Sequence, residues 1–303
     1  MAFTRREFGL SAAAGLAAAA APGWTSAQIT LGNKRIETVS DGYLTLPPEF
    51  LFDGLAPGVL QQALEQYGLP AGPLTPDVNV TLLREKDRVV LFDAGAGPGF
   101  QESAGNLPGA LDVLGVRPDE VTHVVFTHCH PDHLWGVLDD FEDLLFPDAA
   151  YLMGQGEWDY WFDPETADRI SSSRAAMAIG ARRRMEQLED KVQLFRDGEE
   201  ILPGVAAVAT PGHTPGHMSF EVRDGSNGVL VLGDAVGNHH VSFAEPGRPV
   251  GADQEPQKAA AARMRLLDQL ATEQMQLIGY HLPGGGIGRA ERIGSGYRFV
   301  PAA

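Results

Sequence analysis

The chain of 303 residues is poor in cysteine and in positive charge. Its single cysteine, Cys129, excludes an intramolecular disulfide framework. Against 40 aspartates and glutamates it has only 23 lysines and arginines, and its net charge is −17. It therefore lacks the basic surface that nucleic acids and anionic membranes attract. An apolar fraction of 44% with 21% charged residues is typical of a globular protein. We expect an acidic globular protein with no nucleic-acid partner.

Long apolar runs are also scarce, and the N-terminal one has the layout of an export signal. Residues 1–27 have a basic start, an Ala/Leu/Gly run and a small-residue end, too short and too weakly apolar for a membrane span. With Arg5 and Arg6, the stretch TRREFGL resembles a twin-arginine signal, which directs folded proteins to the export machinery. We expect residues 28–303 to be the mature domain, periplasmic or secreted, with no stable membrane insertion. A frayed Ala-rich helix is the alternative.

Short valine-rich runs bounded by Gly, Pro and Asp predict buried strands that lead into polar loops. These runs are residues 88–97, 121–128, 204–213, 228–236 and 276–284. Helical patterns lie between and around them, at residues 57–68, 165–190 and 255–272. In the last of these, the predicted apolar stripe consists of Ala260, Met264, Leu267 and Ala271. Strands that alternate with helices favour an α/β sandwich, and no linker divides it.

Histidines are few but clustered, since three of the nine stand within THCHPDH, residues 127–133. His128 and His130 can face the same way from an extended loop after a strand. Asp132 and His133 turn the other way if a helix begins at the proline between the two pairs. One short loop can thus supply two ligands to each of two adjacent metal ions. Imidazole and carboxylate are donors that suit zinc and neighbouring divalent metals.

More polar side chains stand where predicted strands end. His213, Asp234 and His281 are available as further metal ligands, and Asp93 occupies a similar position. Residues at strand ends converge on one rim of a sheet in α/β folds. An aspartate between two cations can bridge them and offset their charge. The sequence therefore predicts a site for two metals at this rim.

The motifs THCHPDH, PGHTPGH, LGDA and YHLPG, preceded by LFDAG, resemble those of the metallo-β-lactamase superfamily in order and spacing. The resemblance covers residues 35–295 and implies a four-layer αββα sandwich with metals at one edge of its sheets. It implies two divalent ions, zinc in the first place, with Mn, Fe and Co as alternatives. The implied ligands are His128, His130 and His213 for the first ion, Asp132, His133 and His281 for the second, and Asp234 as a bridge. Asp93 and His217 are expected to support these ligands without binding a metal.

Within the superfamily the chain is similar to the methyl parathion hydrolase-like branch, through EWDYWFDP and the tail that begins at residue 255. That branch includes organophosphate triesterases and hydrolases of lactones and aryl esters. The resemblance implies ester hydrolysis by a metal-bridging hydroxide, with Asp234 or Asp132 receiving the proton. We expect a small-molecule lactone or aryl ester, because PGGGIG has glycines where triesterases carry an aromatic residue. The alternatives are an organophosphate triesterase, a β-lactamase, and a non-catalytic metal-binding protein of the same fold.

Aromatic residues are candidates for the substrate pocket. Trp135 stands where the superfamily often has glycine, and the pocket candidates are Trp135, Trp158 and Trp161. The candidates for a lid are Tyr43, Phe50 and Phe52. Cys129 alternates with two predicted ligands, so we expect it to point into the core as an inert thiol. The sequence leaves open whether His239 and His240 line the pocket, and whether the protein is a monomer or a homodimer.

Overall fold

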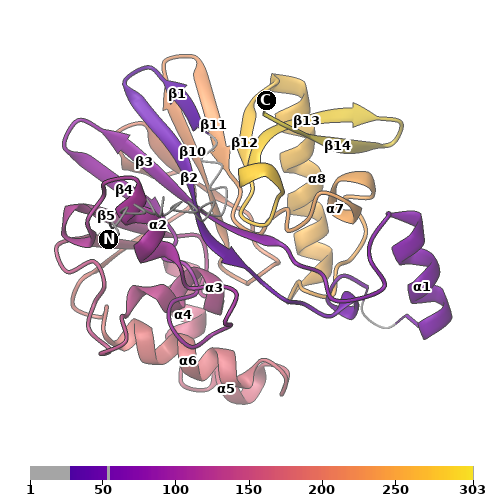
Figure 1. Cartoon of the computed structure of the whole chain (residues 1–303), viewed down its shortest axis with the longest axis horizontal. Helices are drawn as coiled ribbons and strands as arrows, with labels where there is room; N and C mark the ends of the chain where they lie inside the picture. Colours follow the sequence, from indigo (N-terminus) through magenta and orange to yellow (C-terminus); the bar gives the residue numbers. More distant parts are fainter. Residues whose placement is uncertain (1–27, 53–54, 303) are drawn as a thin grey trace, which may run out of the picture.

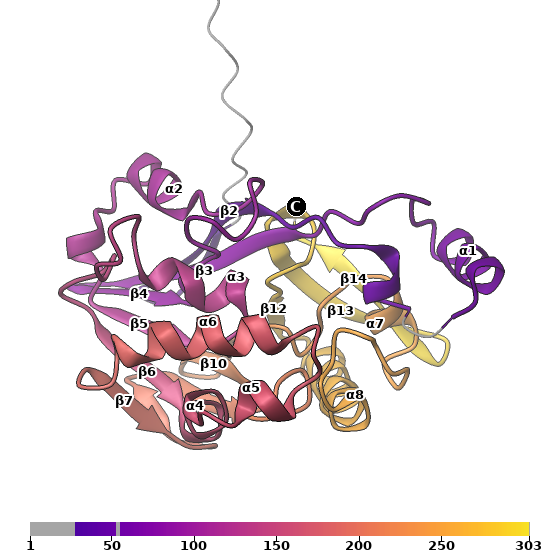
Figure 2. The ribbon, with the colours of Figure 1, turned by 90° about the horizontal axis from the view of Figure 1, so that it is seen from below.

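The computed structural model describes residues 28–52 and 55–302, and it shows two β-sheets packed between two layers of helices (Figures 1 and 2). This arrangement confirms the predicted four-layer sandwich. The predicted export signal, residues 1–27, lies outside the described residues. Among the helices that the structure describes, none combines the length and the apolar character that crossing a membrane requires.

The first sheet has seven strands that follow the order of the chain. They are β1 (Gln28–Leu31), β2 (Lys34–Tyr43), β3 (Asp77–Glu85), β4 (Arg88–Phe92), β5 (His123–Phe126), β6 (Ala150–Gly154) and β7 (Val192–Phe195). Strands β1 to β4 pair antiparallel, and β4 to β7 pair parallel. The parallel strands need crossovers, and the helices of one outer layer lie in these connections.

The second sheet also has seven strands, in the order β14-β13-β12-β11-β10-β9-β8. They are β8 (Glu200–Leu202), β9 (Val205–Ala209), β10 (Met218–Asp224), β11 (Asn227–Val231), β12 (Gln276–Ile278), β13 (Ile287–Ile293) and β14 (Gly296–Pro301). Only β11 and β12 pair parallel. The long helix α8 lies in the connection between these two strands. The five predicted strands are confirmed as β4, β5, β9, β11 and β12.

Helices cover both outer faces of the sandwich. Over the first sheet lie α2 (Leu107–Val113), α3 (Pro131–Leu134), α4 (Gln155–Phe162), α5 (Thr166–Arg169) and α6 (Ala175–Glu186). Over the second lie α7 (Val241–Ala244) and α8 (Pro256–Glu273), and α1 (Pro57–Gln66) stands apart at one end (Figure 1). Short 3₁₀ turns are η1 (Pro48–Phe50), η2 (Pro118–Glu120), η3 (Trp135–Val137) and η4 (Gly284–Gly286). Proline in the first turn, where an N–H has no helical partner, begins α1, α2, α3 and α8.

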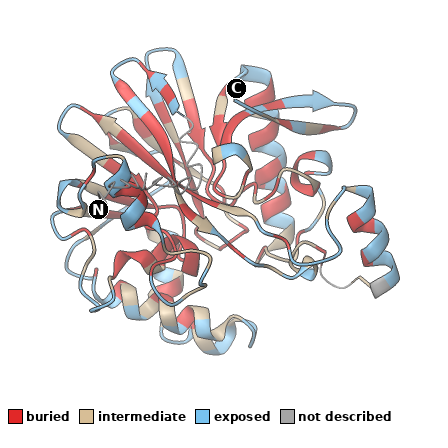
Figure 3. Cartoon of the chain, in the orientation of Figure 1, coloured by how far each residue is buried: buried red, intermediate tan, exposed pale blue. Residues whose placement is uncertain are grey.

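Three apolar cores hold the layers together, and Figure 3 shows buried residues along the strands and on the inner sides of the helices. Between the sheets, the ring of Phe92 in β4 lies 5.3 Å from that of Phe220 in β10. A second core packs the first sheet against α2 to α6, and a third packs the second sheet against α7 and α8. Burial on both faces explains why the central strands are almost entirely apolar.

Two sequence predictions about helices need correction. Residues 165–190 form two helices, α5 and α6, rather than one, because residues 170–174 leave the helical path. In α8, Met264 is 45% exposed, whereas its neighbour Arg263 is 1% exposed. The guanidinium of Arg263 donates hydrogen bonds to the backbone carbonyls of Pro246 and Arg248, so burying it leaves its polar atoms satisfied.

Candidate metal centre

The seven predicted ligands come together at one edge of the sandwich. His128 and His130 follow β5, and the chain then turns into α3, which carries Asp132 and His133. The proline that begins α3 separates the two pairs, as the motif predicted. The other three ligands come from the second half of the chain: His213 lies between β9 and β10, Asp234 follows β11 and His281 follows β12.

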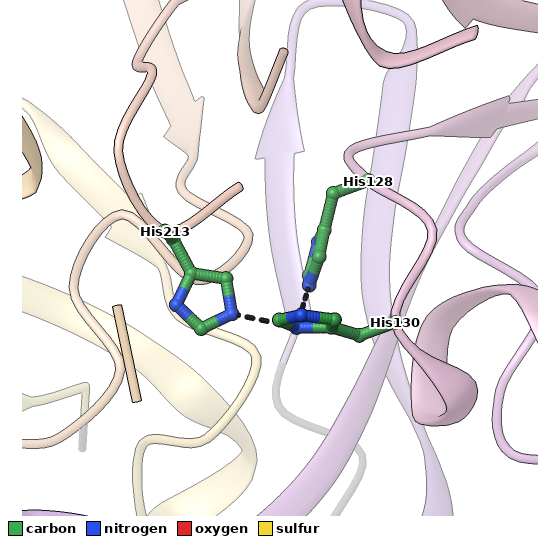
Figure 4. Close-up of side chains that lie close together, drawn as sticks. All are labelled: His128, His130 and His213. Atoms are coloured by element: carbon green, nitrogen blue, oxygen red, sulfur yellow. Dashed lines mark hydrogen bonds between the residues drawn. The ribbon is translucent and has the colours of Figure 1, made fainter. Parts of the chain in front are cut away.

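The first group consists of His128, His130 and His213, whose side chains point toward one another in Figure 4. The Nδ1 atom of His130 lies 3.0 Å from Nε2 of His128 and 2.9 Å from Nε2 of His213. One ring nitrogen from each residue thus converges on a single point. Three converging imidazole nitrogens form a favourable site for zinc or a related divalent ion.

The second group consists of Asp132, His133 and His281. Oδ2 of Asp132 lies 3.4 Å from Nε2 of His133 and 3.2 Å from Nε2 of His281. Asp234 stands between the two groups. Its Oδ1 lies 3.3 Å from His133, and its Oδ2 lies 3.3 Å from both His213 and His281. A single carboxylate therefore faces both sets of nitrogens.

Several polar atoms in the centre lack hydrogen-bond partners and are suited to bind a cation. Oδ2 of Asp132, Nε2 of His133 and Oδ1 of Asp234 are buried, and none has a hydrogen-bond partner within the described residues. Buried polar atoms are rarely left unpaired without a functional reason. Burial opposes charge on Asp234, yet His281 and His133 together hold its pKa well below the usual range. The centre thus holds carboxylates beside His128 and His130, where burial lowers the pKa of both imidazoles and favours their neutral form. Carboxylate oxygens and neutral imidazole nitrogens are donors that fit divalent metal ions.

Hydrogen bonds on the outer side of His133, His281 and His128 set which nitrogen of each ring faces the centre. Nδ1 of His133 lies 2.8 Å from Asp93, and Nδ1 of His281 lies 2.8 Å from the carbonyl of Asp77. Nδ1 of His128 lies 3.0 Å from the hydroxyl of Thr127. Acceptors at Nδ1 hold the proton there, so the lone pair of Nε2 is left for the centre.

Asp93, which the sequence predicts as a support, contacts two parts of the centre. Asp93, directly after β4, has a positive φ of 70°. It accepts hydrogen bonds from the backbone N–H and the hydroxyl of Thr127, at 2.7 and 2.8 Å. One buried carboxylate therefore ties the loop that carries His128 to the ring of His133.

Two supporting residues were missed by the sequence analysis. Nδ1 of His213 lies 3.1 Å from Oδ1 of Asp253, and Nε2 of His130 lies 3.4 Å from the amide of Gln254. The other oxygen of Asp253 pairs with the buried Arg263. Both residues lie in the loop before α8, about 40 residues after His213, and no motif marks them. Only the packing of this loop against the first half of the chain reveals them.

Glu157 is a third residue whose role the sequence did not reveal. Its buried carboxylate accepts hydrogen bonds from the backbone N–H groups of Cys129 and Gly216, at 2.9 and 3.1 Å. It also accepts from the side chains of Thr214 and Trp161, at 2.7 and 2.6 Å. Burial raises the pKa of Glu157 to about 7 although these four donors oppose the shift. Glu157 thus joins the loop of His128 and His130 to the loop of His213.

His217 contacts the loop of Asp234, and Cys129 is buried in the core. Nε2 of His217 accepts a hydrogen bond from the backbone N–H of Asp234, and its Nδ1 lies 2.8 Å from the hydroxyl of Thr210. His217 therefore holds the loop of Asp234 with both nitrogens engaged. The thiol of Cys129 is buried in the core beside Met153, and burial raises its pKa well above the usual range. A buried thiol of this kind is a poor nucleophile.

A cavity of about 1210 Å³ opens onto the centre. The predicted ligands that line it are His130, Asp132, His213, Asp234 and His281. An apolar wall comes from the segments before and after α1, with Leu46, Phe50 and Leu69 among its residues. His239 and His240, whose positions the sequence left open, both line the cavity.

The predicted pocket tryptophans lie elsewhere, so this prediction is corrected. Trp135 packs under the guanidinium of Arg184, 4.1 Å from its ring centroid, and Trp158 stacks on Phe162. Trp161 is fully buried, with its N–H given to Glu157 and its ring edge against His130. None of the three is among the lining residues of the cavity. Their apolar surfaces instead fill the helical layer over the first sheet.

The lid candidates divide in the same way. Phe50 lines the cavity, whereas Tyr43 is exposed and lies outside its lining. Phe52 is buried in a separate apolar cluster beneath α1, with its ring stacked 6.0 Å from that of Tyr67. Only Phe50 is therefore placed to contact a ligand in the cavity.

Comparison with known sequences identifies one matching family. The sequence profile of the Metallo-beta-lactamase superfamily matches residues 75–271, and His281 lies just beyond this range. Protein YobT of Bacillus subtilis is 29% identical over 52% of this chain and 61% of its own length. The N-acyl homoserine lactonase AttM of Azorhizobium caulinodans is 29% identical over 40% of this chain and 43% of its own length. The matches thus span only about half of these relatives.

Solved structures resemble the chain over nearly its whole length. The hydrolase AbOPH of the beta-lactamase superfamily has a TM-score of 0.82 and 25% identity, covering 92% of this chain and 97% of its own. AidC, a dizinc quorum-quenching lactonase with a bound product, N-hexanoyl-L-homoserine, has a TM-score of 0.83 and 22% identity with the same coverage. The second likeness shows a shared fold, since its sequence identity is low.

Proposed function

Because the chain belongs to the metallo-beta-lactamase superfamily, we propose that it is a metal-dependent hydrolase of carboxylic esters, with lactones and aryl esters as its preferred substrates. The proposal rests mainly on the convergence of several imidazole rings beside carboxylate oxygens that lack hydrogen-bond partners. In rings such as His133 and His213, one nitrogen faces the centre and the other contacts an acceptor. We assign His128, His130 and His213 to one divalent ion, and Asp132, His133 and His281 to another. Asp234 would bridge the two.

Two bound divalent ions would supply a water molecule of lowered pKa and a Lewis acid for the carbonyl group of the ester. The chain's own residues would orient the ester and move the proton. Asp132 and Asp234 both line the cavity, where they can contact a bound substrate. Either carboxylate would receive the proton from the attacking water and return it to the leaving oxygen. No serine or cysteine nucleophile is needed, which agrees with the burial of Cys129.

The cavity supports an uncharged ester with an apolar portion. Its volume of about 1210 Å³ exceeds what a small lactone ring would occupy, and its wall at Leu46, Phe50 and Leu69 is apolar. Relatives named as N-acyl homoserine lactonases support a lactone in particular. The similarity to the methyl parathion hydrolase-like branch makes organophosphate triesters the second candidate, because the same groups would attack a phosphoryl centre.

A substrate panel tests the proposal. Purified protein of measured metal content is assayed with dihydrocoumarin, an N-acyl homoserine lactone, p-nitrophenyl esters, paraoxon and a cephalosporin. We expect turnover of a lactone or aryl ester, loss of this activity with EDTA, and loss in the His130→Ala and Asp234→Ala variants without unfolding. His123→Ala is the control, because His123 is not among the residues that line the cavity, and this variant should keep full activity. Full activity in a verified metal-free sample would contradict the mechanism, and turnover of none of the five would favour a binding protein.

We also propose that the protein is exported in folded form to the periplasm or the medium. The support is the sequence of residues 1–27, with Arg5 and Arg6 ahead of an apolar run. Replacing both arginines by lysine should retain the protein in the cytoplasm. Fractionation of cells that express either form would show this, and unchanged export of the double variant would contradict the proposal.

A further inference from the structure

Two adjacent histidines, His239 and His240, stand on the wall of the cavity outside the metal centre. They lie between Asp234 and α7, both half-buried, with ring centroids 3.6 Å apart. The side-chain oxygen of Asn238 accepts hydrogen bonds from the backbone N–H groups of His240 and Ser242, at 3.2 and 3.1 Å. Asn238 therefore fixes the turn that places both rings on the wall.

These two rings differ from the other histidines of the chain. The remaining seven each have a ring nitrogen within hydrogen-bond distance of another group: His123, His128, His130, His133, His213, His217 and His281. Within the described residues, no ring nitrogen of His239 or His240 has such a partner. Half-buried polar atoms that face a cavity must be satisfied by water or by a ligand. The pair thus gives the cavity wall hydrogen-bonding groups that no described residue uses.

The environment of the pair favours an uncharged ligand group. Burial lowers the pKa of both histidines, to about 4 for His240, where His239 adds to the effect. At neutral pH each ring therefore offers one N–H donor and one acceptor nitrogen without a net charge. Neutral donors bind a carbonyl oxygen well and gain much less from a carboxylate than a cationic side chain would.

We propose that the His239–His240 pair binds a second, uncharged carbonyl group of the substrate, such as the amide of an N-acylated lactone, and thereby determines substrate specificity. This inference rests on the proposed ester hydrolysis and assigns the pair no part in breaking the bond. The scissile ester lies at the metal centre, the second carbonyl contacts the pair, and the acyl chain contacts the apolar wall around Phe50. Esters that lack the second carbonyl leave the pair unpaired and lose this contact.

A pair of lactones that share a five-membered ring tests the inference. N-Hexanoyl homoserine lactone carries the amide, and γ-decalactone carries an alkyl chain without it. In the His239→Phe and His240→Phe variants, which keep a flat ring, kcat/KM for the amide lactone should fall about tenfold, the loss of one hydrogen bond. For γ-decalactone it should stay within about twofold of the wild type. The His123→Phe variant is the matched control and should change neither value.

Binding of the open-chain product separates this inference from the proposed function. Calorimetry on the metal-loaded protein should show about tenfold weaker binding of N-hexanoyl homoserine to the two variants, at unchanged metal content. Equal loss on both lactones, or no loss on either, overturns the inference while the hydrolase proposal stands. If the wild type cleaves neither lactone, the proposed function fails for lactones, and the calorimetry still decides the role of the pair. Unchanged binding in the variants, or no binding to the wild type, then overturns it.

Discussion

Replacing Glu157 by glutamine should destabilise the protein and loosen its metal centre together. The carboxylate accepts four hydrogen bonds, two on each oxygen, from residues of three segments. Its Oε1 accepts from Cys129 N–H and Trp161, and its Oε2 accepts from Thr214 and Gly216 N–H. A glutamine of the same shape keeps one oxygen and places an NH₂ group where the other oxygen was.

The size of the stability loss depends on whether each hydrogen-bond donor can find another partner in the variant. The hydroxyl of Thr214 can rotate and accept from the NH₂ group, whereas the backbone N–H of Gly216 has no such freedom. A buried N–H left unpaired costs about 1–3 kcal/mol. Because the pKa of Glu157 is about 7, the carboxyl group is about half ionised at pH 7. The two bonds that remain on the oxygen therefore lose part of the assistance from a charged acceptor, about 1 kcal/mol in total. The free energy of unfolding at pH 7 should therefore fall by about 2–4 kcal/mol.

Two measurements check this prediction. Urea unfolding of the metal-free protein gives the loss of stability, and competition with a chelator gives the metal affinity. Affinity should fall about 10-fold to 100-fold, because the loops that carry His128, His130 and His213 lose a common support. The control is Glu142→Gln, where the exposed carboxylate pairs with Arg183 at the surface and the change should stay below about 0.5 kcal/mol. Equal effects of the two substitutions would refute the reasoning.

The pH dependence gives a further check on Glu157. Burial raises its pKa from 4.5 to about 7, so between these values the folded chain holds a proton that the unfolded chain releases. The resulting contribution to stability is complete below about pH 4.5 and is lost as the pH rises through 7. Glutamine lacks this titration, so the stability difference between the wild type and the variant should narrow from pH 5 to pH 8. A difference that widens over this pH range would show that folding lowers the pKa of Glu157 instead of raising it.

Two other substitutions test how the centre is supported. Asp253→Asn would place a neutral amide against the buried Arg263, so urea unfolding should show that the free energy of unfolding falls by about 3 kcal/mol. Because Asp253 also contacts His213, metal titration should show an affinity lowered about tenfold. An unchanged metal affinity would argue against this support. In Gly216→Ala, the added Cβ would lie 2.0 Å from a backbone nitrogen of α4, and the expected loss is about 3 kcal/mol or more. Gly109→Ala, in the open surface of α2, should be neutral or stabilising, and equal melting temperatures for the two variants would contradict the prediction.

Local patterns were enough to predict the strands and the convergence of the seven polar residues. Burial on both faces makes β4, β5 and β11 almost wholly apolar, and the first polar residue after each marks where it leaves the core. The four predicted ligands in residues 127–133 are close together in sequence, so their spacing was enough to predict that two face one way and two the other. That these residues bind metal ions is still a prediction, which the chelator experiments test.

The orientation of aromatic side chains was not predictable in the same way. Trp135 stands two residues after a predicted ligand, and Trp158 and Trp161 belong to the motif EWDYWFDP, yet all three fill the helical layer instead of the cavity. A helix that packs between other elements buries more than one side, so periodicity does not show which side faces a ligand. The exposed Met264 and the buried Arg263 in α8 illustrate the same limit.

By itself the sequence determined the fold class and the seven candidate ligands, because strand periodicity, proline at helix starts and strand-end residues all act over short distances along the chain. Only the tertiary structure revealed the supports of the centre and the shape of the cavity. Asp253 reaches His213 across 40 residues, and Glu157 joins loops from both halves of the sandwich. Such contacts depend on how the layers pack, and no local pattern encodes them. The position of His239 and His240 on the cavity wall also depends on this packing.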